Sequence, residues 1–402
     1  MKILMIVENG QYENDPRVRR EANALCAAGH TVSVVSACDG KKPWRELIDN
    51  AAVYRFRSFK ARGGILSYFL EYAYSMMAIA WLSLIVLLQE GFDVIHVANP
   101  PDTIVMTTAI YKLFGKQIIY DQHDLNPELY AAKFSNFSPI VYRFLLWLES
   151  QSCRLADQII ATNESYKKTV MARARVSESK ITVVRNGPCL QNMQETDVDL
   201  ELRSRSRNIL VYCGGIGVQD GLDRLCGILY QLRYQLGRED FCCAIIGDGD
   251  ALPQIRKLAA ELCLEDNVWF SGWIYDSKRV LRYLNAADIC VSPEPSNSFN
   301  NRSTFIKIME FMAVGKPIVA FDLLETRFSA QDCAVYARPN DEGDFALLIA
   351  KLMDAPSLRT EMGHLGQKRI RERLAWEYSV PNLLQVYENC ARSEKCVCRS
   401  KA

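Results

Sequence analysis

The sequence of 402 residues lacks a surplus of charge of either sign. Its 48 lysines and arginines balance 47 aspartates and glutamates, which leaves a formal net charge of +1. A protein attracted to nucleic acid by its overall charge is therefore excluded, and any site for a polyanion has to be local. Hydrophobic residues make up 49% of the chain and charged residues 24%, which excludes a disordered chain.

The chain also lacks the cysteine and histidine spacings of metal sites. None of its 14 cysteines forms a CxxC pair, and its four histidines show no ligand spacing with them. Many of the cysteines stand in apolar runs, where cysteine acts as a small hydrophobe, and this usage indicates a reducing cytosol. The segment "GDGD" (247–250) contains an Asp-x-Asp pair, but its two glycines favour a turn over a metal site. We therefore expect no metal and no cofactor, and we interpret the Cys396/Cys398 pair of the tail as incidental.

One stretch, 72–89, lacks charge altogether for 18 residues and is borderline as a membrane span. The apolar run "GFDVIHV" follows at once, so a span would divide a domain, and we expect a helix buried on one side. Just upstream, "YRFRSFKARGG" mixes Arg55, Arg57, Lys60 and Arg62 with aromatic residues. This composition suits either anionic lipid headgroups or an ordinary solvated strand and loop. If the first of these holds, the region 54–90 makes peripheral contact with a membrane.

Short apolar runs alternate with longer amphipathic ones along the whole chain, the pattern of parallel sheets covered by helices. The first series of runs is "KILMIV", "TVSVVS", "DVIHVA", "QIIYD", "QIIATN" and "ITVVRN". The second is "NILVYCGG", "CCAIIGDG", "NVWFSG", "DICVSP", "PIVAFD" and "CAVYAR". The N-terminal run is expected to be the first strand and not an export signal. The fold class is therefore α/β, with two Rossmann-like, doubly wound parallel-sheet domains facing an interdomain cleft.

The expected domain boundaries follow from these two series. The first domain covers 1–188, a polar linker 189–207, and the second domain 208–374, and 375–402 forms a helix that returns to the first domain, followed by a tail.

Polar and glycine-rich residues follow the strands, where such sheets bind their ligands. Gly10 follows the first run and precedes a helix that begins at Asp15 with Arg17 in its first turn. A basic first turn opposes the helix dipole unless an anion is near. Further along come "QHDLNPE" (122–128), "RNGP" (185–188) and "GGIGVQDG" (214–221). One glycine cluster is a weak signal, but several at strand ends indicate a ligand site.

The segment "NNRSTFIKIMEFMAVGKPIV" (300–319) predicts a helix with one polar face. At about 100° per residue, Ser303, Lys307 and Glu310 share that face. Ser303 or Thr304 is the expected N-cap, and Gly315 suits the C′ position. The N–H groups at such an N-terminus suit a phosphate. Taken alone, the segment favours a solvated polar face over a phosphate site.

These blocks, in this order, resemble the retaining, nucleotide-sugar-dependent glycosyltransferases of the GT-B fold, specifically family 4 (glycosyl transferases group 1). "NDPRVRREANALCAAGHTVSVVS", "DVIHVANPPD", "IIYDQHDLNPE" and "SKITVVRNG" carry the resemblance in the first half. "VYCGGIG", "AIIGDGD", "VWFSGW" and "EFMAVGKPIVA" carry it in the second. The segment 300–317 looks like a subgroup concerned with cell-surface polysaccharides.

The resemblance implies transfer of a hexosyl or N-acetylhexosaminyl group from a nucleoside-diphosphate sugar, of UDP type, to a glycan or lipid-linked acceptor, without a metal. The protein would be cytoplasmic, at the inner face of a membrane. The expected catalytic residues are His123, Asp124, Arg302 and Lys307. The expected donor-binding residues are Gly10, Asn186, Gly215, Gly217, Ser303, Thr304, Phe305 and Glu310, the last of them for the ribose hydroxyls. Asp15, Arg17 and Glu128 are expected on the acceptor side.

The sequence departs from the common pattern of this family at two positions. Arg302 stands eight residues before Glu310, where many members have a second glutamate, and Asp220 precedes Gly221, where many have a lysine. Arg302 and Lys307 are the natural replacements for the missing cation, because both can bind phosphate oxygens. Two alternatives stay open: a nucleotide-sugar epimerase of the same architecture, and a partner subunit without catalytic activity, which only Arg302 suggests.

Overall fold

The computed structural model of the chain describes residues 1–58, 65–134, 136–192, 197–274 and 276–400. They form two compact units. Unit 1 comprises Met1–Pro127, Phe137–Arg185 and Ser379–Ala402, and unit 2 comprises Glu128–Asn136 and Asn186–Tyr378. Apart from Glu128–Asn136, unit 2 runs from Asn186 to Tyr378 and so includes the segment 189–207, which was expected to be a linker between domains at 1–188 and 208–374.

Unit 1 is built on a sheet of eight strands in the order β3-β4-β2-β1-β5-β6-β7-β8. All neighbours pair in parallel except β3, which pairs antiparallel with β4. The strands are β1 (Lys2–Val7), β2 (Thr31–Cys38), β3 (Arg45–Ile48), β4 (Ala51–Arg57), β5 (Val94–Ala98), β6 (Gln117–Gln122), β7 (Gln158–Ala161) and β8 (Ile181–Val183). The six strands predicted for this half are confirmed. β3 was not predicted, and a strand in the region of β4 was only one of the two readings of 54–64.

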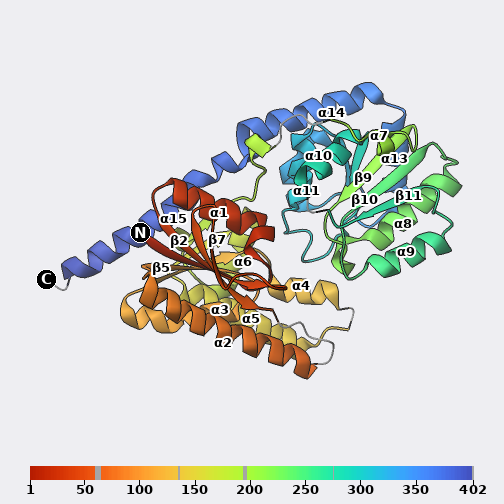
Figure 1. Cartoon of the computed structure of the whole chain (residues 1–402). Helices are drawn as coiled ribbons and strands as arrows, with labels where there is room; N and C mark the ends of the chain where they lie inside the picture. The colour runs from red at the N-terminus through yellow and green to blue at the C-terminus, as the bar shows by residue number, and fades with distance from the viewer. Residues whose placement is uncertain (59–64, 135, 193–196, 275, 401–402) are drawn as a thin grey trace. The chain divides into compact units, whose positions relative to one another are not determined.

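Helices cover both faces of this sheet (Figure 1). One layer contains α2 (Ile65–Gln89), α3 (Thr103–Thr108) with its 3₁₀ continuation η2 (Ala109–Phe114), α5 (Pro139–Leu155) and α6 (Glu164–Ala174). The opposite face carries α1 (Pro16–Ala27) and α15 (Val380–Ser400), which contact each other. This distribution follows from right-handed crossovers between parallel strands. The helix α4 (Asn126–Lys133) begins in unit 1 and ends in unit 2.

The strand β4 corrects the first reading of 54–64. Tyr54, Arg55 and Phe56 are all buried. The Arg55 guanidinium donates to Glu13 at 2.6 Å and to Glu46 at 2.8 Å. These side chains pack into unit 1 and cannot face a lipid surface. Residues 54–57 do form a strand, but Arg55 is buried in it instead of solvated, whereas Arg57 at its end is exposed. Lys60 and Arg62 lie outside the described residues.

The uncharged stretch forms most of α2, as predicted. Its segment Leu70–Gln89 is long and apolar enough to cross a membrane by length and composition. However, Ile79, Leu82 and Val86 are buried on one side of the helix, which packs on β4, β2 and β1. The helix therefore covers the sheet, in agreement with the expectation of burial on one side.

Unit 2 is built on a parallel sheet of six strands in the order β11-β10-β9-β12-β13-β14. The strands are β9 (Asn208–Cys213), β10 (Phe241–Ile246), β11 (Val268–Gly272), β12 (Ile289–Ser292), β13 (Ile318–Phe321) and β14 (Ala334–Ala337). All six correspond to predicted runs. The helices are α7 (Leu200–Arg203), α8 (Leu222–Tyr230), α9 (Leu252–Glu261), α10 (Ser277–Ala286), α11 (Ile306–Ala313), α12 (Leu324–Ala330), α13 (Glu342–Met353) and α14 (Pro356–Arg369).

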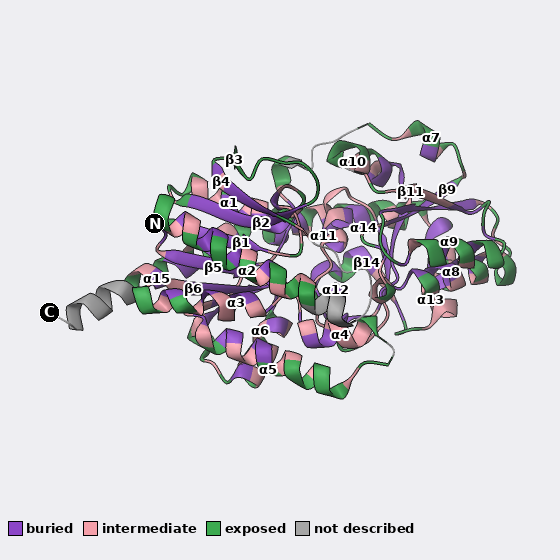
Figure 2. Ribbon diagram, turned by 60° about the horizontal axis from the view of Figure 1, so that its bottom comes forward, coloured by how far each residue is buried: buried purple, intermediate pink, exposed green. Residues whose placement is uncertain are grey.

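One hydrophobic core lies on each face of this second sheet. The first joins the strands to α8, α9 and α13, and the second joins them to α10 and α11. In each unit the central strands are buried, whereas the edge strands β3 and β11 are more exposed (Figure 2). Both domains are therefore doubly wound Rossmann-like sheets, which confirms the predicted fold class.

Two loops at the carboxyl edge of this sheet meet backbone to backbone. They follow β9 and β10, and a Cβ atom at Gly247 would lie 1.9 Å from the carbonyl oxygen of Gly214. A Cβ at Gly249 would lie 2.4 Å from the carbonyl oxygen of Ile216. The glycines of "GDGD" are therefore required for this close approach.

We predict that Gly247→Ala destabilises the protein strongly, because the new Cβ would overlap the backbone of Gly214 and the φ of +146° is unfavourable for a side chain. The expected loss in the free energy of unfolding, measured with urea, is about 2–5 kcal/mol. Gly237→Ala is the control, since φ there is +66° and a Cβ would meet no atom within 4 Å. Equal losses for the two variants would show that the close approach does not matter.

Candidate functional site

The glycine loop after β9 is held by its own hydrogen bonds. The amide of Gly214 donates to the carbonyl of Ile246, and the amide of Ile216 donates to the carbonyl of Asp248. The amide of Gly217 donates to the Asp220 carboxylate at 2.8 Å. Three amides of a loop expected to hold phosphate are thus already bonded within unit 2.

Lys307 places an ammonium group beside this loop. Its Nζ donates to Glu294 Oε1 at 2.5 Å and to the Tyr212 hydroxyl at 2.9 Å. A Cβ at Gly214 would lie 3.0 Å from the Lys307 Cε, so the side chain runs along the loop. Burial alone would lower the pKa of Lys307, but the charge of Glu294, with smaller contributions from Tyr212 and Asp220, raises it. The ammonium is therefore charged at neutral pH.

The helix that carries Lys307 begins later than predicted. α11 starts at Ile306, and its N-cap residue Phe305 makes no side-chain cap hydrogen bond. The Ser303 hydroxyl donates to the carbonyl of Phe299, and the Thr304 hydroxyl donates to Glu325 at 3.4 Å. The prediction that Ser303 or Thr304 caps this helix is wrong, because both hydroxyls have partners elsewhere.

Other features of the predicted helix are confirmed. Gly315 follows the end of α11 with φ +70°, and the amide of Lys316 donates to the carbonyl of Phe311. Lys307 and Glu310 lie three residues apart within the helix and so share a face. Phe305 packs against both cores of unit 2.

Glu310 lies near the carboxyl end of β9. Burial raises the pKa of the Cys213 thiol to about 12, and the charge of Glu310 contributes to this shift. Lys307 lies beside Gly214, the first residue after β9, and the charge of Glu310, one turn further along the same helix, acts on Cys213, the last residue of the strand.

The charge around Lys307 is not purely positive. Glu294 is fully buried, and burial raises the pKa of Asp220 above its ordinary value, although Lys307 opposes that shift. Arg302 lies in the loop before α11, where its guanidinium donates to the carbonyl of Ser298 at 2.8 Å. Arg302 therefore lies in the same segment as Lys307 and is the second cation that this segment offers.

A buried charge network lies at the carboxyl end of β6 in unit 1. Arg17 donates to both carboxylate oxygens of Asp121, at 3.0 and 2.7 Å, and pairs with Glu21 at 3.1 Å. His123 Nε2 lies 2.6 Å from Asp121 Oδ2. Burial would lower the pKa of His123, but the charge of Asp121 and this hydrogen bond raise it. His123 is thereby favoured in its protonated form.

Asn99 holds the loop of the predicted catalytic residues. Its Oδ1 accepts from the amides of His123 at 2.6 Å and Asp124 at 3.2 Å. Its Nδ2 donates to the carbonyl of Asp124 and to Asp102. Asn99 is fully buried at the end of β5, so its amide fixes the backbone from which His123 and Asp124 project.

The residues expected on the acceptor side have structural partners. The Asp15 carboxylate accepts from the amides of Arg17 and Val18 and so caps α1. The Arg17 guanidinium is buried in the network above instead of lying at the surface. Glu128 is buried on α4. The basic first turn is thus neutralised by the protein's own carboxylates.

Two of the predicted donor-binding residues are Gly10 and Asn186. Among the described residues, no contact places either of them beside the glycine loop. A Cβ at Gly10 would meet no atom within 4 Å. Asn186 is buried and precedes Gly187, where a Cβ would lie 1.9 Å from the carbonyl oxygen of Leu374. Their roles in donor binding stay predictions.

Three side chains of the unit 1 network, Glu21, His96 and Asp121, lie close enough together to hold a metal ion. The Arg17 guanidinium already contacts both of these carboxylates, so a divalent cation would face a positive charge at short range. The residues present fit an internal ion pair better than a metal site.

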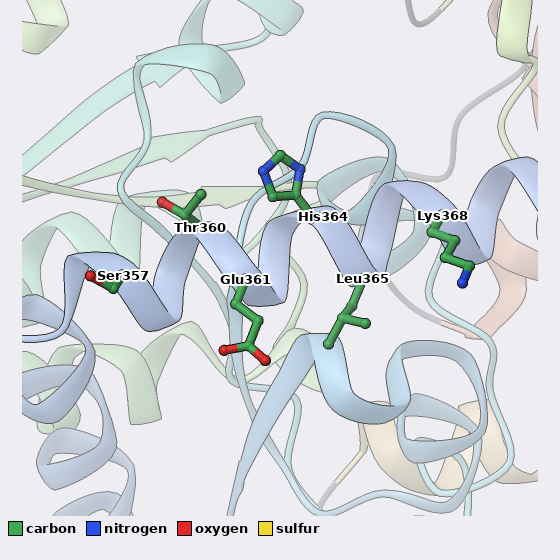
Figure 3. Close-up of a pocket in the computed structure, with 6 residues that line it drawn as sticks. All are labelled: Ser357, Thr360, Glu361, His364, Leu365 and Lys368. Atoms are coloured by element: carbon green, nitrogen blue, oxygen red, sulfur yellow. The ribbon is translucent and has the colours of Figure 1, made fainter.

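A shallow pocket on unit 2 is lined by side chains of one helix, α14 (Figure 3). The lining residues are Ser357, Thr360, Glu361, His364, Leu365 and Lys368. None of the residues predicted from the sequence lines it, and we assign it no role.

Family models match both halves of the chain. Residues 17–190 match Glycosyltransferase Family 4, and residues 207–355 match Glycosyl transferases group 1. The matches support a GT-B glycosyltransferase. The glycine loop, Lys307 and Glu310 fall within the second match, and His123 falls within the first.

Curated relatives of this glycosyltransferase are distant. The chain is 22% identical over 343 residues to the chitobiosyldiphosphodolichol beta-mannosyltransferase of Debaryomyces hansenii, covering 79% of this chain and 72% of that protein. It is 24% identical over 318 residues to the MMP alpha-(1->4)-mannosyltransferase of Mycolicibacterium hassiacum, covering 76% and 72%.

Solved structures show the same fold over nearly the whole chain. Sucrose-phosphate synthase from Thermosynechococcus elongatus matches with a TM-score of 0.77 and 19% identity, covering 98% of this chain and 99% of that one. Anabaena HepE in complex with UDP and glucose matches with a TM-score of 0.72 and 17% identity, covering 98% and 100%. The fold is therefore GT-B.

Sequence reasoning missed three residues on which the site depends. Asp121 and Asn99 sit at the ends of otherwise apolar runs, and Glu294 follows another such run. A charged or amide side chain at the end of a buried strand was the available signal. The residues that each of them contacts come from other segments of the chain, so only the folded structure shows these contacts.

We predict that His123 stabilises the protein more at low pH than at high pH. Its folded-state pKa is raised, so its contribution is fully present below the unfolded pKa of about 6.5 and is lost as the pH rises through the folded value. The destabilisation caused by His123→Gln, measured by urea unfolding, should therefore be larger at pH 5.5 than at pH 8.5.

His30 gives the opposite sign and serves as the control. Burial lowers the pKa of His30, and the N-terminal ammonium group lowers it further, so protonation of the unfolded chain costs stability as the pH falls. His30→Gln should thus become relatively more stable at low pH. The same trend in both variants would contradict the roles assigned to Asp121 and to burial.

Proposed function

We propose that the protein is a retaining glycosyltransferase that moves a hexosyl or N-acetylhexosaminyl group from a nucleoside-diphosphate sugar, of UDP type, to a glycan or lipid-linked acceptor in the synthesis of a cell-surface polysaccharide or glycoconjugate. One observation carries the donor half of this proposal: the Lys307 side chain runs along Gly214, where the glycine loop begins after β9, and Glu310 lies one turn further along the same helix. The carboxyl edge of such a sheet is the usual place for a nucleotide.

The similar proteins have names that indicate the same class of reaction, glycosyl transfer. The curated relatives include mannosyltransferases and a D-inositol 3-phosphate glycosyltransferase. The structural neighbours include HepE in complex with UDP and with UDP-glucose. These names favour a nucleoside-diphosphate sugar over other anionic ligands for the edge of unit 2.

The chemistry at this edge follows from charge. Cleavage of the bond between the sugar and the diphosphate builds negative charge on the leaving phosphates, and fixed cations stabilise that charge. Lys307 and Arg302 supply the cations, and the N-terminus of α11 adds its unpaired amides. Glu310 accepts hydrogen bonds from the ribose hydroxyls. Because these groups do the work of a Lewis acid, the proposed reaction needs no metal ion.

In this proposal, His123 and Asp124 are the residues of unit 1 that contact the donor sugar and the acceptor. The protonated imidazole of His123 can donate one hydrogen bond to Asp121 and another to a sugar hydroxyl. Asn99 and Asp121 would keep the ring and the loop in one orientation, so that little ordering is needed when the substrate binds. We place the protein in the cytoplasm, where nucleotide sugars and a lipid-linked acceptor at the inner face of a membrane are both accessible.

Incubation of the purified protein with a panel of nucleotide sugars and a membrane extract tests the reaction. Transfer of label from one donor to a lipid or glycan product is the expected result. Conversion of the donor to another sugar without an acceptor would identify an epimerase instead. Donor binding without any turnover under these conditions would identify a partner subunit that lacks catalytic activity.

We predict that Lys307→Ala and Arg302→Ala each weaken the binding of a nucleoside diphosphate by about 1.5–3 kcal/mol, the range for hydrogen bonds to charged groups. Isothermal titration calorimetry with UDP provides the measurement. Lys351→Ala removes an exposed lysine of α13 and should leave the affinity unchanged. If both site variants bind UDP as tightly as the unmodified protein, neither residue holds the diphosphate.

We also predict that Asp220→Asn strengthens the binding of UDP by roughly fivefold, because it removes a carboxylate close to the proposed diphosphate position. The asparagine oxygen can still accept from the Gly217 amide, so the loop should keep its shape. Asp250→Asn, at an exposed position near the loop after β10, is the matched control. Weaker binding by Asp220→Asn would place the diphosphate away from Asp220.

A further inference from the structure

Two loops of unit 2 carry the groups proposed to bind the donor. The glycine loop (214–221) follows β9, and a longer loop (293–305) follows β12 and leads into α11. We call the longer one the Arg302 loop. β9 and β12 are neighbouring parallel strands, so both loops leave the same edge of the sheet. The spacing between these two loops therefore decides whether their groups can act on one ligand.

The two loops approach each other closely at Gly221. The φ of Gly221 is +72°, and a Cβ there would lie 2.4 Å from the carbonyl oxygen of Pro293 and 2.8 Å from the Cδ of Pro295. A glycine allows this approach because it has no Cβ and adopts positive φ readily. The end of the glycine loop thus lies directly against the start of the Arg302 loop.

The side chain of Asn300 joins the two loops by hydrogen bonds. Its Nδ2 donates to the carbonyl of Gln219 at 3.0 Å and to the carbonyl of Pro295 at 2.9 Å. Gln219 belongs to η5 (Val218–Asp220), the 3₁₀ turn of the glycine loop, and Asn300 is fully buried. Because the two donated bonds use both hydrogens of the amide, the group cannot turn over without losing its hold on both loops.

The oxygen of the same amide shows that local stability does not explain this side chain. Asn300 Oδ1 is buried and accepts no hydrogen bond from the described residues, and a buried acceptor without a partner costs stability. An apolar side chain would avoid that cost but could not bond to the carbonyl of Gln219. The hydrogen bonds that the side chain does make, among the described residues, are those donated to the two loops.

The backbone around Asn300 also determines where Arg302 lies. The amide of Asn300 donates to Asn297 Oδ1 at 2.8 Å, and its carbonyl accepts from the amide of Ser303 at 3.3 Å. The Arg302 guanidinium donates to the carbonyl of Ser298 within the same turn. A displacement of Asn300 would therefore move Arg302 relative to the glycine loop.

We propose that Asn300 is a positioning residue of the donor site. By bonding the glycine loop to the Arg302 loop, it sets the distance from the glycine loop to the cations of Arg302 and Lys307 before a nucleoside diphosphate binds, and it does not touch that ligand itself. Groups held at a fixed spacing need less ordering when a ligand arrives, which strengthens binding. This inference rests on the proposed function, because it takes both loops as parts of one nucleotide site.

Calorimetric titration with UDP tests the positioning role. Asn300→Ala should weaken the binding of UDP by about tenfold, because the two loops lose the hydrogen bonds that hold them together. Asn208→Ala is the matched control. Asn208 is also buried, and its Nδ2 also donates to two acceptors, the carbonyl and the carboxylate of Asp240, but it lies at the start of β9, the end away from the glycine loop. Equal weakening in both variants would overturn the proposal.

A double-mutant cycle separates positioning from a loss of stability alone. If Asn300 acts by placing the Arg302 loop, Arg302→Ala should weaken UDP binding less in the Asn300→Ala background than in the unmodified protein, because the guanidinium is already displaced there. The same pairing of Arg302→Ala with Asn208→Ala should be additive. Full additivity in both pairs would show that Asn300 does not act through Arg302.

Hydrogen exchange without nucleotide distinguishes a failure of this inference from a failure of the proposed function. Asn300→Ala should speed exchange in peptides from both 214–221 and 293–305, whereas Asn208→Ala should change neither. Faster exchange in 293–305 alone would show that Asn300 does not hold the glycine loop. If both loops respond but the unmodified protein does not bind UDP, the proposed function is wrong, and the positioning role is wrong with it.

The unmodified protein decides the matter if Asn300→Ala does not fold. UDP should then slow exchange in both loops, because ordering of one loop is passed to the other through the Asn300 amide. Protection of 214–221 without any change in 293–305 would overturn the proposal.

Discussion

The candidate donor site depends on one constraint: the positive charge of the Lys307 ammonium group, which is largely removed from water, has to be balanced by a nearby carboxylate. Lys307 lies beside the glycine loop with its charge balanced by Glu294 and its position fixed by Tyr212. A charge in such a place needs a partner, because desolvation would otherwise favour the neutral amine. In the proposed function, a diphosphate would share Lys307 with Glu294 and would lie close to the carboxylate of Asp220. The second cation, Arg302, is more accessible, and the two together offset the carboxylates that already line the loop.

The two units make different physical contributions to the proposed function. Unit 2 offers charges and backbone amides at the edge of a parallel sheet, where close contact between glycines keeps the loops after β9 and β10 in place. Unit 1 offers an imidazole whose protonation and orientation depend on Asp121 and Asn99.

Much of the fold could be predicted from the sequence because buried parallel strands are continuous apolar runs, and twelve such runs appear as strands. β3 escaped because it is exposed and polar. The burial of β4 escaped because Arg55 is a buried charge whose partners, Glu13 and Glu46, come from the first loop and from β3. The position of Glu310 followed from helix periodicity. The N-cap residue of α11 could not be predicted in this way, because the hydroxyls of Ser303 and Thr304 donate to partners that the local sequence does not reveal. Burial of Arg17 was equally invisible without its contact to Asp121.

The central claim is that the carboxyl edge of the sheet in unit 2 binds a nucleoside-diphosphate sugar. Hydrogen exchange of the unmodified protein with and without UDP tests it most directly. The account predicts slower exchange in two peptides, one covering 212–221 with the glycine loop and one covering 304–314 with α11. Protection confined to other parts of unit 2, such as α14, would contradict the account, as would the absence of protection at a UDP concentration that saturates binding.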